Sequence, residues 1–152
     1  MIVREMKLYD VPQVAAMERE IFSQPWSEQG FADSLTNPNT LFLVAEEAAG
    51  GADGRAIAGY VGMYQALDEG EITNVAVEND FRRRGIGRLL MGELQKKAAE
   101  RGVTRIVLEV RASNAPAIRL YEQMNFCRIG TRKGFYDFPK EDADIMLWEL
   151  EK

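Results

Sequence analysis

Residues 71–110 read EITNVAVENDFRRRGIGRLLMGELQKKAAERGVTRIVLEV, and this stretch decides the topology. The apolar run over residues 71–77 predicts a strand, and residues 104–110 predict a second one. Between them, leucines and alanines recur at helical spacing after Gly87, until Gly102 ends the helix. A strand, a crossover helix and a strand require the two strands to run parallel.

The flanking sequence adds more strands and helices. Trp26 and Phe31, on either side of the capping residue Ser27, have the spacing of a hydrophobic staple. Helices are expected after Asp10, Ser27 and Asn114, and strands over residues 2–5, 41–46, 56–65, 127–133 and 143–149. The expected fold is one α/β (α+β) domain over residues 1–152, with a mixed, mostly antiparallel seven-stranded sheet and about four helices on its two faces.

The composition excludes several kinds of chemistry. The chain of 152 residues contains no histidine, which rules out hydrolases built on imidazole and every histidine-ligated metal site. Its one cysteine, Cys127, cannot form an intrachain disulfide or a cysteine-type zinc site, so we expect no metal. Acid–base chemistry must therefore use carboxylates, tyrosines, lysines or this thiol.

The net charge of −5 disfavours binding to a phosphate backbone, so we expect no nucleic-acid partner. Residues 1–5 become charged too early for a signal peptide. No apolar run approaches the roughly 18–20 residues that span a bilayer, so no membrane partner is expected. We expect a cytoplasmic protein, with a monomer as the default.

The loop before the central helix, RRRGIG at residues 82–87, is the first candidate site. It matches neither the dinucleotide fingerprint nor the P-loop. Its glycines nevertheless allow close backbone approach, and the following helix directs free N–H groups and positive dipole charge towards the loop. Four arginines add positive charge: Arg82, Arg83, Arg84 and Arg88. The loop either binds phosphate or is a tight turn with a solvated basic edge.

Three further residues could carry chemistry. Glu109 lies near the carboxyl end of an apolar strand, where ligands gather in open α/β sheets, and could act as a base. Alternatively, it pairs with Arg105 or Arg111. Tyr121 could equally be a core residue, and Asn114 is most simply a helix cap.

Taken together, these residues resemble a known family. The pattern Arg82-x-x-Gly85-x-Gly87 after a strand resembles the acetyl-CoA loop of the Gcn5-related N-acetyltransferases. The stretch LEVRASNAPAIRLYE at residues 108–122 is similar to the bacterial ribosomal-protein-alanine N-acetyltransferases. The short motifs PWS at residues 25–27 and EDA at residues 141–143 are similar to them as well. The resemblance covers essentially the whole chain.

This resemblance implies direct acetyl transfer, with Glu109 as the base and Tyr121 as the acid. It implies that the central parallel strands split to hold acetyl-CoA, with its pyrophosphate on the glycine loop and its acetyl group against residues 75–77. The implied cofactor contacts are Val75, Ala76, Val77, Arg82, Arg83, Arg84, Gly85, Ile86, Gly87, Arg88 and Asn114.

The resemblance also implies an acceptor: the N-terminal alanine of a small-subunit ribosomal protein. Its site would lie between Trp26 and a loop of residues 134–139 that carries Phe135 and Tyr136. The family often has two tyrosines at that pair, so one hydroxyl is missing here. Asp144 replaces an aliphatic residue, and the loop of residues 47–54 has no assigned role.

Three other functions stay open. The chain could acetylate lysine side chains, or a small amine such as a polyamine or an antibiotic. It could also be a non-catalytic acyl-CoA-binding module, although such a module needs neither Glu109 nor Tyr121.

Overall fold

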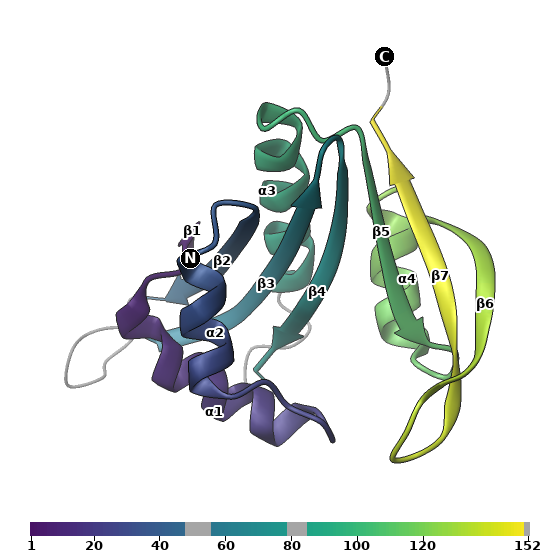
Figure 1. Ribbon diagram of the computed structural model, residues 1–152, viewed down its shortest axis with the longest axis horizontal. Helices are drawn as coiled ribbons and strands as arrows, with labels where there is room; N and C mark the ends of the chain where they lie inside the picture. Colours follow the sequence, from purple (N-terminus) through teal and green to yellow (C-terminus); the bar gives the residue numbers. More distant parts are fainter. Residues whose placement is uncertain (48–55, 79–84, 151–152) are drawn as a thin grey trace.

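The computed structural model describes residues 1–47, 56–78 and 85–150 (Figure 1). Its strands form one seven-stranded sheet in the order β1-β2-β3-β4-β5-β7-β6. The strands are β1 (Ile2–Glu5), β2 (Thr40–Glu47), β3 (Ala56–Ala66), β4 (Glu69–Val77), β5 (Arg105–Arg111), β6 (Cys127–Tyr136) and β7 (Glu141–Glu149). The helices are η1 (Leu8–Asp10), α1 (Val11–Ile21), α2 (Glu28–Leu35), α3 (Ile86–Glu100) and α4 (Ala115–Gln123).

The sheet confirms the predicted topology. β4 and β5, which α3 connects, form the parallel pair, and their neighbours are antiparallel. The ladder between β4 and β5 is short: it starts at Glu69 and Arg105 and ends at Glu71 and Val107. Beyond that point the two strands separate, as Figure 1 shows.

A bulge in β4 lies where this separation begins. Gly62 of β3 pairs with Asn74, but the next residue, Met63, pairs with Ile72, so Thr73 is the extra residue on β4. Bulges bend a strand and increase its twist. The bulge therefore turns the end of β4 away from β5 while β4 stays paired with β3.

Two hydrophobic clusters cover the two faces of the sheet. On one face, α1 and α2 bury Val14 and Phe31 against Phe42 and Tyr60. On the other face, α3 and α4 pack on the sheet through residues that include Leu90, Leu94, Tyr121, Val61, Ile106 and Leu108. Helices thus lie on both faces, as expected (Figure 1).

The N-terminal region corrects one expectation. Asp10 precedes α1 but makes no capping bond to it. Both of its carboxylate oxygens accept bonds from Arg4 of β1 at 2.8 Å, and one also accepts from the backbone N–H of Lys7. Asp10 therefore fastens the short helix η1 to β1. The cap at Ser27 is confirmed, with a 3.0 Å bond from the N–H of Gly30.

The C-terminal hairpin is longer than expected. β6 continues to Tyr136 instead of ending at residue 133, and β7 begins at Glu141. Phe135 and Tyr136 therefore lie at the end of a strand and not in a loop. Register shifts between Arg128 and Gly130 and after Arg132 break the regular alternation, which hides this strand from pattern reading.

Candidate active site

Glu109 lies on the part of β5 that has separated from β4. Its neighbours Leu108 and Val110 are buried in the α3–α4 cluster. Because side chains alternate along a strand, Glu109 points to the opposite face, the one that α1 and α2 cover. This face is where an acceptor could reach it.

The partner of Glu109 is an arginine two strands away. Arg132 of β6 places its Nε 3.6 Å from the Glu109 Oε1, and the Glu109 side chain is 19% exposed. The sequence predicts Arg105 or Arg111, which are close to Glu109 in the chain, as its ion-pair partner. The pairing follows from the order β5-β7-β6, which a local pattern does not reveal.

Arg111 does not pair with Glu109 and instead holds the β6–β7 turn in place. It donates to the carbonyl oxygens of Pro139 at 2.9 Å and Asp137 at 3.1 Å, and it pairs with Glu141 at 3.3 Å. Glu141 in turn accepts a 2.7 Å bond from the N–H of Ser113, and this bond lowers the pKa of its carboxyl. The turn is thereby tied to β5 and to the start of α4.

Tyr136 and Phe135 lie at the end of β6 beside this arginine. The Arg111 guanidinium is 4.4 Å from the centre of the Tyr136 ring. Burial raises the pKa of Tyr136, and the negative charge of Glu109 raises it further. The Phe135 ring meets the Tyr136 ring edge to face, with centroids 5.0 Å apart. The structure thus brings Tyr136 near Glu109, as the predicted acceptor site requires.

Tyr121 belongs to the other face. It is 5% exposed on α4 and its ring lies 6.0 Å from that of Phe126. Burial, and to a lesser degree the charge of Tyr136, raises the pKa of Tyr121, which keeps its hydroxyl protonated at neutral pH. Tyr121 therefore lies on the α3–α4 face of the sheet, and Glu109 points to the opposite face.

The glycine loop is described only from Gly85 onward, and Arg82, Arg83 and Arg84 lie outside the described residues. Gly85 has φ +76°, and among the described residues other than its chain neighbours, none has an atom within 4 Å of a Cβ built on it. It is the N-cap residue of α3 and, as a glycine, has no side chain to cap the helix. Ile86 is buried in the core, whereas Arg88 is exposed. A helix start with a glycine N-cap, and with space beside it in the described part of the chain, suits an anionic ligand such as phosphate.

The remaining predicted cofactor residues fall on two elements. Val75 and Val77 are half-buried and Ala76 is 7% exposed, all on β4 beyond the end of its ladder with β5. The Asn114 side chain caps α4 by accepting a 3.3 Å bond from the N–H of Ala117. Its interpretation as a cap is confirmed, and its contact with a cofactor stays a prediction.

On the α1–α2 side, Trp26 packs on Phe31 and Phe42 with ring centroids 5.3 and 6.0 Å apart. An open hollow of about 330 Å³ lies beside Trp26, and its other lining residues are Ser27, Gly30 and Ser34. The predicted acceptor region thus has Trp26 on one side. The hairpin that carries Phe135 and Tyr136 belongs to the opposite part of the sheet.

A buried polar network, also absent from the sequence predictions, anchors this region. Glu18 of α1 is 3% exposed, and it accepts bonds from the Tyr60 hydroxyl at 2.5 Å and from the N–H of Trp26 at 3.0 Å. The amide nitrogen of Asn74 lies 3.4 Å from the same carboxylate. Glu18 therefore fastens the segment before α2 to β3 and β4.

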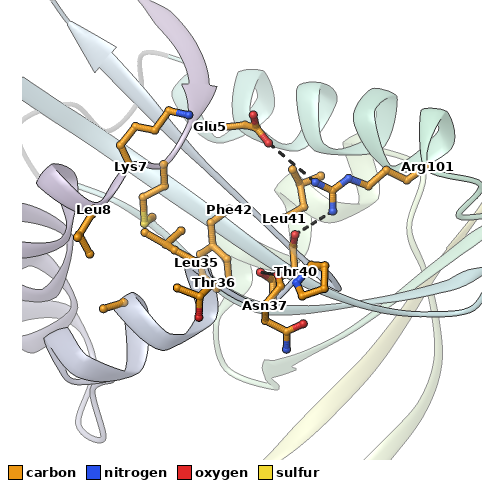
Figure 2. Close-up of a pocket in the computed structure, with 13 residues that line it drawn as sticks. Glu5, Lys7, Leu8, Leu35, Thr36, Asn37, Thr40, Leu41, Phe42 and Arg101 are labelled. Atoms are coloured by element: carbon orange, nitrogen blue, oxygen red, sulfur yellow. Dashed lines mark hydrogen bonds and ion pairs between the residues drawn. The ribbon is translucent and has the colours of Figure 1, made fainter.

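A larger pocket of about 450 Å³ lies elsewhere, between η1, α2 and the β1–β2 edge of the sheet (Figure 2). There Arg101 donates to the carbonyl oxygen of Thr40 at 2.8 Å and lies 3.9 Å from Glu5. This edge is separated from Glu109 by β3 and β4, so the pocket is not part of the candidate site.

Among the described residues, no cluster of three or more histidine, cysteine, aspartate or glutamate side chains could hold a metal ion. No helix in the described part of the chain is long and apolar enough to cross a membrane.

The sequence pattern of the acetyltransferase (GNAT) family matches residues 11–126. A ribosomal protein bS18-alanine N-acetyltransferase from Escherichia coli (strain K12) is 34% identical over 146 residues, or 95% of this chain and 94% of the relative. The crystal structure of the ribosomal-protein-S18-alanine N-acetyltransferase from Escherichia coli aligns with a TM-score of 0.85 and 31% identity, covering 99% of this chain and 94% of that one. NAA60 from Arabidopsis thaliana in complex with acetyl-CoA shares the fold, with a TM-score of 0.89 and 21% identity over 97% of both chains.

The split sheet, the glycine at the start of α3 and this match over most of the chain agree: the chain belongs to the acetyltransferase (GNAT) family. Its enzyme class is that of the N-acetyltransferases, which are acyltransferases.

The buried tyrosines predict a pH dependence of stability. Burial raises the pKa of Tyr60 and Tyr121 above the ordinary 10.0, so the folded protein holds both protons more tightly than the unfolded chain does. Their stabilising effect is complete below pH 10 and is lost as the pH rises further. Between about pH 10 and 11, the free energy of unfolding should fall by up to about 1.4 kcal/mol per pH unit for each hydroxyl.

Tyr121→Phe should make this slope shallower, as measured by urea denaturation at a series of pH values. Tyr64→Phe is the matched control, because the Tyr64 side chain is 41% exposed, and its slope should equal that of the wild type. Equal slopes in all three proteins would contradict the assignment to Tyr121.

Proposed function

We propose that this protein transfers the acetyl group of acetyl-CoA to a free N-terminal amine, and that its acceptor is the N-terminal alanine of ribosomal protein bS18. The observation that carries the proposal is the position of Glu109 on β5, just beyond the point where β5 separates from β4. The activity for which the Escherichia coli relatives are named supports the choice of acceptor.

Acetyl-CoA fits the residues on the other side of the separation. As a glycine N-cap, Gly85 leaves space among the described residues at the start of α3, which suits the pyrophosphate. Val75 and Ala76 lie on β4 where its ladder with β5 has ended, so backbone groups there can bond to the acetyl and pantetheine parts. Acetyl-CoA supplies an activated acetyl thioester and a thiol leaving group.

The residues of this chain then move two protons. Glu109 removes a proton from the acceptor ammonium, directly or through water, which frees the nitrogen lone pair to attack the acetyl carbon. The C–N bond forms and the C–S bond breaks, and Tyr121 gives its proton to the departing sulfur. The nitrogen then loses its second proton, which returns through solvent water to the Tyr121 oxygen and restores the hydroxyl. An N-terminal amine, with a pKa of about 8, is easier for a carboxylate base to deprotonate than a lysine side chain, with a pKa of about 10.4.

A panel of acceptors tests this function, with thiol release from acetyl-CoA as the measurement. A peptide with a free N-terminal alanine should be acetylated. The same peptide with a blocked N-terminus and an internal lysine should not react, and neither should a small polyamine. Turnover of the polyamine or the lysine peptide alone would assign the protein to one of the other acetyltransferase classes. No turnover of any acceptor, together with acetyl-CoA binding, would favour a non-catalytic module.

Glu109→Gln tests the base. The amide cannot accept the proton, so kcat should fall by about 10²–10⁴-fold while the affinity for acetyl-CoA stays nearly constant. Steady-state kinetics and calorimetric titration measure the two quantities. Glu69→Gln, at the exposed start of β4, should retain wild-type turnover. If Glu109→Gln also retains it, Glu109 is not the base.

Gly85→Val tests the cofactor loop. The side chain would project into the open space beside Gly85, so affinity for acetyl-CoA should fall at least about tenfold, roughly 1.4 kcal/mol. Gly102→Val is the control, because Gly102 also has a positive φ, +84°, and an equally open Cβ position. Both variants carry the same backbone strain. Calorimetric titration showing equal affinity for both would refute the loop assignment.

A further inference from the structure

Glu109 does not face open solvent in this structure, because a cation from the same chain lies against it. The guanidinium of Arg132 is held between two groups: the Glu109 carboxylate, at 3.6 Å from its Nε, and the ring of Phe135, 5.6 Å from its Cζ. A carboxylate opposite an aromatic ring is a pairing that attracts cations. The proposed base thus belongs to a small cation-binding site that is filled internally.

The fold explains how Arg132 reaches across β7. In the sheet register, Arg111 pairs with Ala143, which pairs with Arg132. Two residues further along each strand, Glu109 pairs with Ile145, which pairs with Gly130. All these residues share one face of the sheet. Because Ala143 is small, the long Arg132 side chain can cross over β7 towards Glu109.

Arg132 is held much less firmly than Arg111. The Arg132 side chain is 58% exposed, whereas Arg111 is 25% exposed and is bonded to the carbonyls of Asp137 and Pro139 and to Glu141. Exposed ion pairs contribute little to stability. The guanidinium can therefore leave Glu109 while the hairpin around Arg111 keeps its shape.

An N-terminal amine with a pKa of about 8 arrives mostly as an ammonium ion at neutral pH. The base must then receive a cation, and Arg132 already fills that place. We propose that Arg132 stands in for the acceptor ammonium in the free enzyme, and that the acceptor binds by displacing its guanidinium from Glu109. Arg132 thus sets acceptor affinity by competing with the acceptor ammonium for Glu109. This inference rests on the proposed function, in which Glu109 is the base for an amine.

Arg132→Gln tests the proposal by removing the competing cation. The KM for the free-alanine peptide should fall by about two- to fivefold with kcat nearly unchanged, the range that an exposed ion pair allows. Arg132→Lys keeps a cation and should retain the wild-type KM. Methylguanidinium, added at a non-denaturing concentration, should fill the vacated place in Arg132→Gln and inhibit competitively with the peptide. It should inhibit the wild type less.

Arg128→Gln is the matched control. Arg128 is also on β6, its side chain is 63% exposed, and it pairs with a carboxylate, Asp144, at 3.2 Å. Its variant should keep the wild-type KM. An unchanged or higher KM in Arg132→Gln, or equal changes in the Gln variants at 128 and 132, would overturn the proposal. If the wild type itself does not acetylate the alanine peptide, the proposed function fails first, which separates the two outcomes.

Discussion

The early end of the β4–β5 ladder is the constraint on which the rest of the structure depends. Each of these strands keeps an antiparallel partner on its outer side, β3 for β4 and β7 for β5, so both stay in the sheet after they separate. The bulge at Thr73 bends β4 where the separation begins. A continuous sheet would isolate its two faces. Where the strands separate, the proposed base on one face and the proposed acid on the other can serve one reaction.

The burial of Tyr121 matters for the proposed acid. A tyrosine with a raised pKa gives up its proton less readily, which by itself would make it a poor partner for a thiolate. The same apolar surroundings would disfavour a free thiolate and so make the departing sulfur more basic. Burial therefore raises the pKa of the proton donor, Tyr121, and that of the departing thiol that accepts the proton. It also keeps the Tyr121 hydroxyl protonated until the C–S bond breaks.

The sequence predicts the elements well because their signals are local. The crossover at residues 71–110 and the cap at Ser27 both follow from periodicity and capping chemistry, and the structure confirms them. The sequence does not predict that Arg132 is the partner of Glu109, nor that Glu18 contacts Tyr60 in the core. Both contacts join strands or helices that are distant in the chain. Asp144 is explained in the same way: its partner Arg128 lies on the neighbouring strand.

β5 positions several parts of the candidate site. It presents Glu109, and two residues later Arg111 holds the turn between β6 and β7 by its carbonyl oxygens. Glu141 links that turn to Ser113, at the start of the helix that carries Tyr121. The proposed base, the proposed acid and the hairpin proposed to bind the acceptor are thereby all positioned from one strand. Within that fixed frame, the exposed Arg132 at Glu109 is the component that can move without disturbing the others.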